Sequence, residues 1–356
     1  QFTPFYQYYS TMSIQSSKPT NISNSSNIIL FGSKIQNEND KNLLESFKKV
    51  YNHLFHFTYR TGFEAIGKSM YCSDAGWGCM LRTAQMLLAN TLARHFKELS
   101  VDGILTDNRE RQLLRLFRDT TEQSAGFSIH NIAMRGEEYG TRVGEWFGPQ
   151  VACDVLRDCV QREASVDMSV YVARDATIYR NEVLQLCEQQ QGEALLILVP
   201  NRLGLSELNN MYLSQLLTVF QQSHSMGIVG GKSNAARYYV GVVDSRDVLY
   251  LDPHTVQPVV NMDNAQFSVD SYHPTQHSSM PLCDIDPSLA MAFYCHTRVQ
   301  LTNLLDQLEN NICKKNDFPL LNVAKQPPIY SDSTIINFNM NDDNDDNDKS
   351  KNQTSI

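Results

Sequence analysis

A glycine-rich turn leads directly into a helix in the stretch Ser73-Asp-Ala-Gly-Trp-Gly-Cys-Met-Leu-Arg82. From Cys79 onward, apolar side chains recur at the spacing of one helix face, at Met80, Ala84, Leu87, Leu88 and Leu92. This pattern predicts a buried amphipathic helix that begins at or just before Cys79. The glycines on either side of Trp77 allow the backbone to turn sharply before that helix.

A thiol at the start of a helix has two properties of a catalytic nucleophile. The positive end of the helix macrodipole favours the thiolate, which is the reactive form. The backbone N–H at the same place can donate to the oxyanion that forms when a carbonyl is attacked. An inert, buried cysteine at the start of a core helix would fit the same pattern, so the residues around Cys79 leave both interpretations open.

A base for this thiol is predicted at His254, in the segment Leu251-Asp-Pro-His254 that closes an expected strand. Residues two apart on an extended segment point to the same side, so Asp252 and His254 can face one cleft. An ordinary Asp-Pro turn with an exposed histidine beside it is the alternative. A nucleophile and its base need only be adjacent in space, so the distance between Cys79 and His254 along the chain is no objection.

The remaining pattern predicts a mixed core. Helices are expected at 106–118 and 150–161, and a buried strand at 194–199. Two further strands, at 238–244 and 248–252, are expected to form a hairpin through the turn-forming residues 244–247. Helices first and strands later, without regular alternation, favour an α+β fold with an antiparallel sheet.

Composition places the chain among ordinary globular proteins. Of its 356 residues, 42% are hydrophobic and 19% are charged, and the net charge of −9 disfavours nucleic acid as a partner. The longest strongly apolar run, 194–199, is too short to cross a bilayer. The sequence contains eight cysteines but no C-x-x-C pair, which favours reduced thiols in the cytoplasm over a zinc site or a disulfide framework.

The two ends of the chain differ from its middle. Residues 1–27 are rich in Ser, Thr, Asn, Gln and Tyr and are predicted to be a flexible arm, while the true N-terminus is left open because the sequence begins at Gln1. Residues 326–356 are rich in Asn and Asp and are predicted to be a flexible acidic tail. The catalytic domain is expected to span 28–325.

Several motifs in register resemble the autophagin family of cysteine proteases over about this whole domain. They are Phe57-Thr-Tyr-Arg60, the nucleophile segment 73–82, Gln85-Met86, Gly144-Glu-Trp-Phe-Gly-Pro149, Gly227-Ile-Val-Gly-Gly-Lys232, Tyr250-Leu-Asp-Pro-His254, Asp286-Pro-Ser-Leu-Ala290 and Phe293-Tyr-Cys295. The resemblance implies a papain-like fold with a small inserted subdomain. It also implies a cytoplasmic enzyme, expected to be a monomer, that cleaves after the C-terminal glycine of GABARAP-like ubiquitin-like modifiers of autophagy. Such an enzyme would also release these modifiers from phosphatidylethanolamine during a peripheral encounter with the membrane.

The same resemblance implies roles for individual residues. Cys79 would attack the glycine carbonyl, His254 would relay the proton and Asp252 would orient the imidazole. Tyr59 would supply an oxyanion-hole hydroxyl. Trp146 would cover the cleft in the free enzyme, together with a glycine-rich loop at 225–234 whose Gly230 and Gly231 allow it to open. No cofactor and no metal are implied.

Alternatives remain at three places. Gly231-Lys-Ser233 ends like a phosphate-binding loop, but Met226 stands where the first glycine should be and a strand is expected where a helix should follow. Phe318-Pro-Leu-Leu321 fits a short segment that docks the modifier, and Cys72 is a candidate redox partner for Cys79. At the level of function, a transglutaminase-like enzyme would place His before Asp, and a modifier-binding protein would have lost catalysis.

Overall fold

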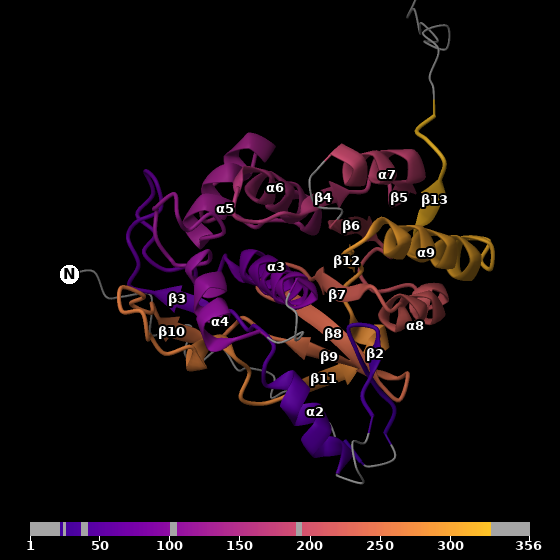
Figure 1. The fold of residues 1–356 in the computed structure, drawn as a ribbon, viewed down its shortest axis with the longest axis horizontal. Coiled ribbons are helices and arrows are strands. Elements are labelled where there is room, and N and C mark those ends of the chain that lie inside the picture. The colour runs from indigo at the N-terminus through magenta and orange to yellow at the C-terminus, as the bar shows by residue number, and fades with distance from the viewer. Residues whose placement is uncertain (1–21, 24–25, 37–41, 100–104, 190–193, 329–356) are drawn as a thin grey trace, which may run out of the picture. The chain divides into compact units, whose positions relative to one another are not determined.

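The computed structural model describes residues 22–23, 26–36, 42–99, 105–189 and 194–328 (Figure 1). The chain divides into two units, Gln1–Gln326 and Pro327–Ile356, and all the helices and strands of the described residues belong to the first unit. The predicted arm lies almost entirely outside the described residues. So does the predicted tail, and both stay predictions.

Within the described residues, nine strands form one sheet (Figure 1). Seven of them lie in the order β11-β9-β8-β7-β12-β6-β4, while β1 pairs with β8 and β2 pairs with β1. These strands are β1 Ile28–Leu30, β2 Ser33–Lys34, β4 Ser169–Val172, β6 Leu195–Arg202, β7 Ser225–Gly230, β8 Arg237–Val243, β9 Asp247–Leu251, β11 Ser278–Pro281 and β12 Ser288–Cys295. The expected strand at 194–199 is confirmed as β6, and the expected hairpin is confirmed as β8 and β9.

The sheet is mixed, which corrects the prediction of an antiparallel one. Strand β4 pairs with β6 in parallel, whereas the other pairs of this sheet are antiparallel. The chain between β4 and β6 contains helix α7, Arg180–Gln189. A crossover through a helix returns the chain to the same end of the sheet, so the second strand runs parallel to the first.

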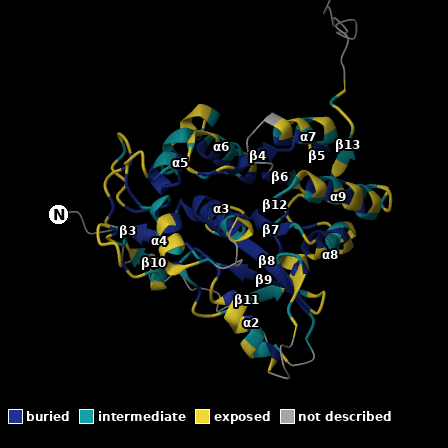
Figure 2. Cartoon of the chain, viewed as in Figure 1, coloured by how far each residue is buried: buried dark blue, intermediate teal, exposed yellow. Residues whose placement is uncertain are grey.

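Helices cover both faces of the sheet. Alternate residues of β6 separate the two cores: Leu196 and Leu198 pack with helices α3 and α6, while Leu195 and Ile197 pack with α8 and α9. Because both faces are covered, strands β4, β6, β7, β8, β9 and β12 are buried along nearly their whole length, whereas β2 and β11 are not (Figure 2). The helices are α2 Leu43–Tyr51, α3 Cys79–Glu98, α4 Asp107–Arg115, α5 Ile129–Arg135, α6 Pro149–Arg162, α7, α8 Leu213–Gln221 and α9 Arg298–Leu308. Short turns of 3₁₀ helix lie at Gly136–Tyr139, Asn210–Tyr212, Asp270–Tyr272 and Leu282–Asp284, and a π-helical turn lies at Glu309–Cys313.

The three helices expected from the sequence are confirmed at α3, α4 and α6. Two small parallel sheets stand apart from the large one: β3 Tyr59–Thr61 pairs with β10 Val256–Pro258, and β5 Thr177–Tyr179 pairs with β13 Asn322–Ala324. The first of these pairs Tyr59 with Val256, two residues after His254, and so it brings together two segments that are far apart in the sequence. The small inserted subdomain stays a prediction.

Candidate active site

Cys79 is the first residue of helix α3, and its side chain is fully buried. Gly78 precedes it as the N-cap and provides no side-chain hydrogen bond to the helix. The first amides of a helix have no acceptor within it, so the N–H of Cys79 is available to another group. The positive end of the macrodipole lies at the same point.

The turn before the cysteine is closed by Asp74. Its backbone carbonyl accepts hydrogen bonds from the N–H groups of Trp77 at 3.2 Å and Gly78 at 2.8 Å. A Cβ atom at Gly78 would lie 2.7 Å from Oδ2 of Asp74, closer than side chains tolerate. Glycine is therefore required immediately before the cysteine.

A buried ion network holds this turn against the helix. Nε of Arg82 lies 2.8 Å from Oδ2 of Asp74, and Nη1 of Arg82 lies 2.9 Å from Oδ1 of Asp119. The backbone N–H of Arg60 also donates to Oδ1 of Asp74 at 2.7 Å, which ties strand β3 to the same carboxylate. The position of Cys79 thus depends on charges that are removed from water.

Asp74→Ala is expected to lower the free energy of unfolding by about 3–5 kcal/mol, because Arg82 loses a buried partner. Urea denaturation measures this loss. Asp263→Ala is the matched control: Asp263 pairs with Arg118 at 2.7 Å but is 67% exposed, and such a surface pair contributes about 0–1 kcal/mol. Equal losses from the two substitutions would show that the buried network contributes no more than a surface pair.

The Asp-Pro-His segment follows the end of β9 at Leu251. The N–H of Tyr59 donates to the carbonyl of Pro253 at 2.9 Å, and Nε2 of His56 lies 2.7 Å from the carbonyl oxygen of Asp252. Both contacts come from the chain around strand β3, which is joined to the turn before Cys79 through Arg60 and Asp74. The segment is thereby held beside the N-terminus of α3.

Asp252 and His254 form a close pair. Oδ1 of Asp252 accepts from Nδ1 of His254 at 2.5 Å and from its backbone N–H at 3.0 Å. Burial opposes charge on both groups, but these bonds outweigh it. The hydrogen bond to His254 lowers the pKa of Asp252 to about 2. The hydrogen bond to Asp252 and the interaction with Cys79 raise the pKa of His254 to about 9.

Cys79 lies on the other side of the same imidazole. Burial would raise the pKa of its thiol. Hydrogen-bonding interactions with His254 and with the backbone amide of Ala236, followed by the charge of His254 and the Tyr59 hydroxyl, lower the pKa below the ordinary value of a cysteine. Nδ1 of His254 is taken by Asp252, so the thiol faces Nε2. Nε2 is buried and makes no hydrogen bond of ordinary geometry within the described residues. Among the described residues Nε2 therefore has no competing partner, and the thiol is the group with which it interacts.

Tyr59 completes the group. Its ring lies edge-on to His254 with 5.6 Å between the ring centroids. Its hydroxyl is buried and makes no hydrogen bond of ordinary geometry in the described part of the chain. Burial and the neighbouring Cys79 raise the pKa of this hydroxyl, which keeps it a donor. A buried donor without an acceptor next to a thiol is suited to an oxyanion formed on attack.

The arrangement therefore contains a thiol with a lowered pKa, a base in contact with it, a carboxylate on the base and two candidate oxyanion donors. These are the requirements of nucleophilic acyl transfer. No cluster of three or more His, Cys, Asp or Glu side chains that could hold a metal ion occurs among the described residues.

Comparison with known proteins agrees with this chemistry. The profile of the peptidase C54 catalytic domain matches residues 44–307. The chain belongs to the peptidase C54 family. It is 31% identical to the cysteine protease ATG4B of Gallus gallus over 319 residues, 79% of this chain and 80% of the relative. It is 34% identical to the cysteine protease ATG4b of Arabidopsis thaliana over 80% of this chain and 64% of the relative.

The family confirms the resemblance to the autophagins and shows that this C54 peptidase is a cysteine protease of autophagy. The transglutaminase-like and binding-only alternatives are set aside on this ground. Among the helices of the described residues, none is long and apolar enough to span a membrane.

Trp146 lies in the loop before α6 of the peptidase and is half-buried against the core that contains Cys79. Gly144, two residues earlier, has a φ of 91°, and a Cβ atom there would overlap the ring of Tyr71. That ring packs against Trp77 with 5.6 Å between the centroids. The Trp146 loop is thus connected through Tyr71 to the turn that precedes the cysteine, and the role of Trp146 as a cover stays a prediction.

The glycine-rich loop of the C54 peptidase is shorter than expected. Residues 225–230 form the buried strand β7, paired with β8 and β12, so Gly230 belongs to the sheet and not to a loop. The loop proper is 231–236, and Gly231 has a φ of 140° at its start. Its other end touches the site, because the amide of Ala236 reaches Cys79. Strand β8 follows this loop directly, which excludes a phosphate-binding loop because that motif requires a helix here.

Phe318–Leu321 fits the pattern of a docking segment, but its packing argues against that role. Phe318 is 67% exposed, but Leu321 is fully buried in the core of the peptidase. Gln215 on α8 holds the segment in place, donating to the carbonyl of Phe318 at 3.1 Å and accepting from the N–H of Leu320 at 2.8 Å. A docking motif needs both apolar side chains free, and here one belongs to the fold.

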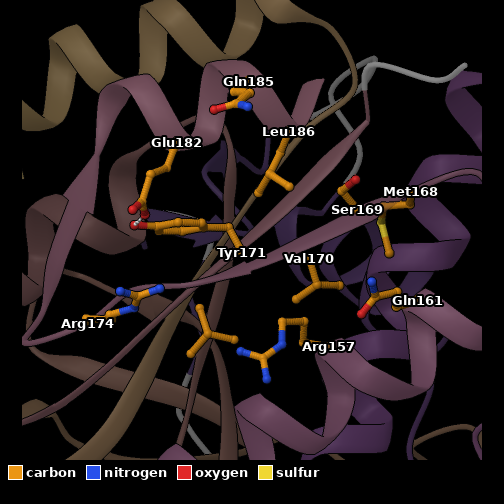
Figure 3. Close-up of a pocket in the computed structure, with 11 residues that line it drawn as sticks. Arg157, Gln161, Met168, Ser169, Val170, Tyr171, Arg174, Glu182, Gln185 and Leu186 are labelled. Atoms are coloured by element: carbon orange, nitrogen blue, oxygen red, sulfur yellow. Dashed lines mark hydrogen bonds between the residues drawn. The ribbon is translucent and has the colours of Figure 1, made fainter. Parts of the chain in front are cut away.

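A cavity of about 390 Å³ lies elsewhere in the peptidase, beside the edge strand β4 (Figure 3). Arg157 and Gln161 of α6 line one side of it and Glu182 of α7 lines the other, where the hydroxyl of Tyr171 donates to Glu182 at 2.9 Å. None of the residues around the cysteine lines this cavity. The candidate active site is therefore separate from it.

Proposed function

We propose that this C54 peptidase cleaves after the C-terminal glycine of GABARAP-like ubiquitin-like modifiers, and that it releases the same modifiers from phosphatidylethanolamine. The observation that carries the proposal is the series of interactions from Asp252 to His254 and from His254 to the buried thiol of Cys79. Both substrates present the same reacting group, a glycine carbonyl in an amide bond. One acyl-transfer site can therefore serve both reactions.

In the proposed mechanism, the thiolate of Cys79 attacks the glycine carbonyl, and the new oxyanion accepts hydrogen bonds from the Cys79 N–H and the Tyr59 hydroxyl. The C–N bond then breaks, and the imidazolium of His254 protonates the departing amine, which is either a peptide or the lipid ethanolamine. A thioester remains on Cys79. Water, deprotonated by His254, hydrolyses it to the free glycine carboxylate and restores the thiol.

The burial of Cys79 supports glycine as the residue cleaved. The sulfur is fully buried and Nε2 of His254 is also removed from solvent. A residue with a side chain would need additional space beside the sulfur, whereas glycine brings its carbonyl in with the least volume. Burial also requires something to move before the substrate arrives, and Trp146 and the loop 231–236 are the segments we assign to that movement.

Intact-mass analysis tests the proposal with a GABARAP-like precursor that extends beyond its glycine. The expected result is the loss of the whole extension at the glycine. A second reaction uses the modifier conjugated to phosphatidylethanolamine in vesicles, and the expected product is the modifier with a free glycine carboxylate. A folded enzyme that leaves both substrates intact would contradict the proposal, and cleavage at another residue would contradict the glycine assignment.

The pH dependence of cleavage is expected to be bell-shaped. The rate falls at low pH, as the Cys79 thiolate is protonated below its lowered pKa. It falls at high pH as His254, with a pKa of about 9, loses the proton that the leaving amine needs. Asp252 stays charged throughout because its pKa is about 2. Measuring kcat/KM across pH checks this, and a rate that keeps rising well above pH 9 would exclude His254 as the acid.

Trp146→Ala is expected to speed access to the site several-fold and to leave the acylation step nearly unchanged. The physical reason is that the indole packs on the core around Cys79, so its removal opens the approach to the thiol. Among the described residues, no hydrogen bond joins the indole to His254 or Asp252. Stopped-flow kinetics separates binding from acylation. An acylation rate that falls while binding is unaffected would place Trp146 in the chemistry and not in the cover.

A further inference from the structure

Arg237 contacts the carboxylate that we assign to catalysis, and the sequence pattern suggests no role for it. It is the first residue of β8, directly after the loop 231–236. Its Nε lies 3.3 Å from Oδ2 of Asp252, while Oδ1 of the same carboxylate accepts from His254. Each oxygen of Asp252 thus has its own charged or dipolar partner.

The guanidinium is itself held in place. It lies over the ring of Tyr250 at 5.0 Å from the centroid, and this ring packs edge-on to Tyr239 of the neighbouring strand. Tyr239 and Tyr250 belong to the core on the α8 and α9 side, whereas Cys79 and Ala236 belong to the core on the α3 side. Arg237 therefore reaches Asp252 from the face of the sheet opposite to the sulfur, so it is not placed to touch the reacting carbonyl.

Both hydrogen bonds from His254 reach the same oxygen of Asp252, Oδ1, so they leave the plane of the carboxylate poorly fixed. Rotation about the bond between Cβ and Cγ of aspartate is broad, so donors on one oxygen alone do not determine that plane. A second, charged donor on the other oxygen restricts that rotation and strengthens both contacts. The charge of Arg237 also contributes, after the bonds to His254, to the lowered pKa of Asp252.

We propose that Arg237 is a positioning residue of the active site, which holds Oδ2 of Asp252 so that Oδ1 stays on Nδ1 of His254. The inference rests on the proposed function, since it acts through Asp252. Together with Ala236, Arg237 also connects the C-terminal end of the loop 231–236 to two members of the catalytic group. The amide of Ala236 reaches Cys79, and the next residue holds Asp252. A movement of this loop would therefore change the contacts of the thiol and of the carboxylate together.

The charged and titratable groups around Arg237 set the expected response. They are Asp252, Tyr239 and Tyr250. His56 lies within hydrogen-bond distance of the backbone carbonyl of Asp252, and burial lowers the pKa of His56, so its imidazole is neutral. Without Arg237, the carboxylate turns away from the imidazole for part of the time. The imidazolium and the thiolate it stabilises both become less favourable, so the pKa of His254 falls and that of Cys79 rises.

Arg237→Met is therefore expected to narrow the bell-shaped profile of kcat/KM against pH from both sides. It should also lower the maximum of kcat/KM about tenfold, by analogy with residues that orient the ligands of a metal. In an Asp252→Asn background the same substitution should cause no further loss of kcat/KM, because Arg237 acts only through its contact with Asp252. The matched control is Arg246→Met. Arg246 pairs with Asp247 at the far end of the same hairpin, is 80% exposed and leaves the profile unchanged.

Two results would overturn the inference. If both limbs of the bell move to higher pH together, Arg237 acts only as a nearby positive charge and does not position Asp252. If the profile equals that of the wild type while thermal stability falls, its role is structural. Arg237→Lys, which keeps the charge but changes the donor geometry, replaces the methionine variant if that one does not fold, and it should narrow the bell by a smaller amount.

Alkylation separates this inference from the proposed function. Iodoacetamide is added across pH, and the modified Cys79 peptide is quantified by mass spectrometry, so no substrate is involved. If Cys79 of the wild type titrates as an ordinary thiol, the proposed nucleophile is wrong. If the pKa of Cys79 is lowered equally in the wild type and in Arg237→Met, the assignment of the nucleophile holds and the role proposed for Arg237 is wrong. A Cys79 pKa that is lowered in the wild type and higher in Arg237→Met supports both the nucleophile and the role of Arg237.

Discussion

Cys79→Ala is expected to reduce cleavage of the modifier precursor by about 10⁶-fold, the loss found when the nucleophile of a catalytic triad is removed. Binding of the modifier should survive, because alanine is smaller than cysteine and Cys79 makes no ion pair that the fold depends on. Intact-mass analysis measures turnover, and calorimetry measures binding by the variant. The thiol is the only group of the site that can form the thioester, so no neighbour can replace it.

Cys72→Ala is the control for this prediction. Cys72 lies in the same region of the chain but is exposed, and its substitution leaves the helix start and the ion network intact. It should cleave at the rate of the wild type. Turnover by Cys79→Ala comparable to that of Cys72→Ala would remove Cys79 from the mechanism. Whether Cys72 is a redox partner of Cys79 stays an open alternative.

Asp252→Asn is expected to lower kcat by about 10⁴-fold, the loss associated with the carboxylate of a catalytic triad. Asparagine keeps the size of the side chain but has no negative charge. The imidazolium of His254, whose raised pKa depends on Asp252, is then no longer favoured. An amide can also present its NH₂ group to Nδ1, which selects the wrong tautomer. The thiol of Cys79 should return toward ordinary reactivity.

The measurement is a single-turnover acylation rate with the precursor, compared with that of Asp247→Asn. Asp247 lies at the other end of strand β9 and pairs with Arg246 in the turn of the hairpin. Its substitution therefore reports on the loss of an ion pair in the same strand. The control should acylate normally. A rate for Asp252→Asn close to that of the control would leave Asp252 with a structural role only.

Local patterns predicted the elements whose partners are close in sequence. The helix that begins at Cys79 was predicted from apolar spacing and two glycines, and the hairpin of β8 and β9 from a turn composition between two apolar runs. Strand β7 was missed because its glycines indicated a loop, whereas in the fold Gly227 and Gly230 are strand residues that lie against neighbouring backbone. A close approach of two backbones leaves no periodicity in the sequence.

The parallel pairing of β4 with β6 was also missed, since it depends on a crossover and not on either strand. Phe318–Leu321 matched a docking motif, and only the packing of Leu321 into the core excluded it. Arg237 could have been suspected from its position, since it begins β8, and β8 pairs with β9, the strand that ends one residue before Asp252. The contact of Arg237 with Oδ2 of Asp252 could not be predicted, because the distance between residues on paired strands depends on the register of the strands.

From the sequence alone came the identities of the chemical groups: a thiol at a helix start, a carboxylate and an imidazole two residues apart, and a tyrosine in a shared motif. These follow from local rules, because helix position and residue spacing act over a few residues. Only the tertiary structure brought Cys79 to His254, placed the amide of Ala236 on the sulfur and placed Arg237 on the second oxygen of Asp252. Those contacts join segments far apart in the chain, so they exist only once the sheet and its helices have packed. Against the effect of burial, they lower the pKa of Cys79 and raise that of His254.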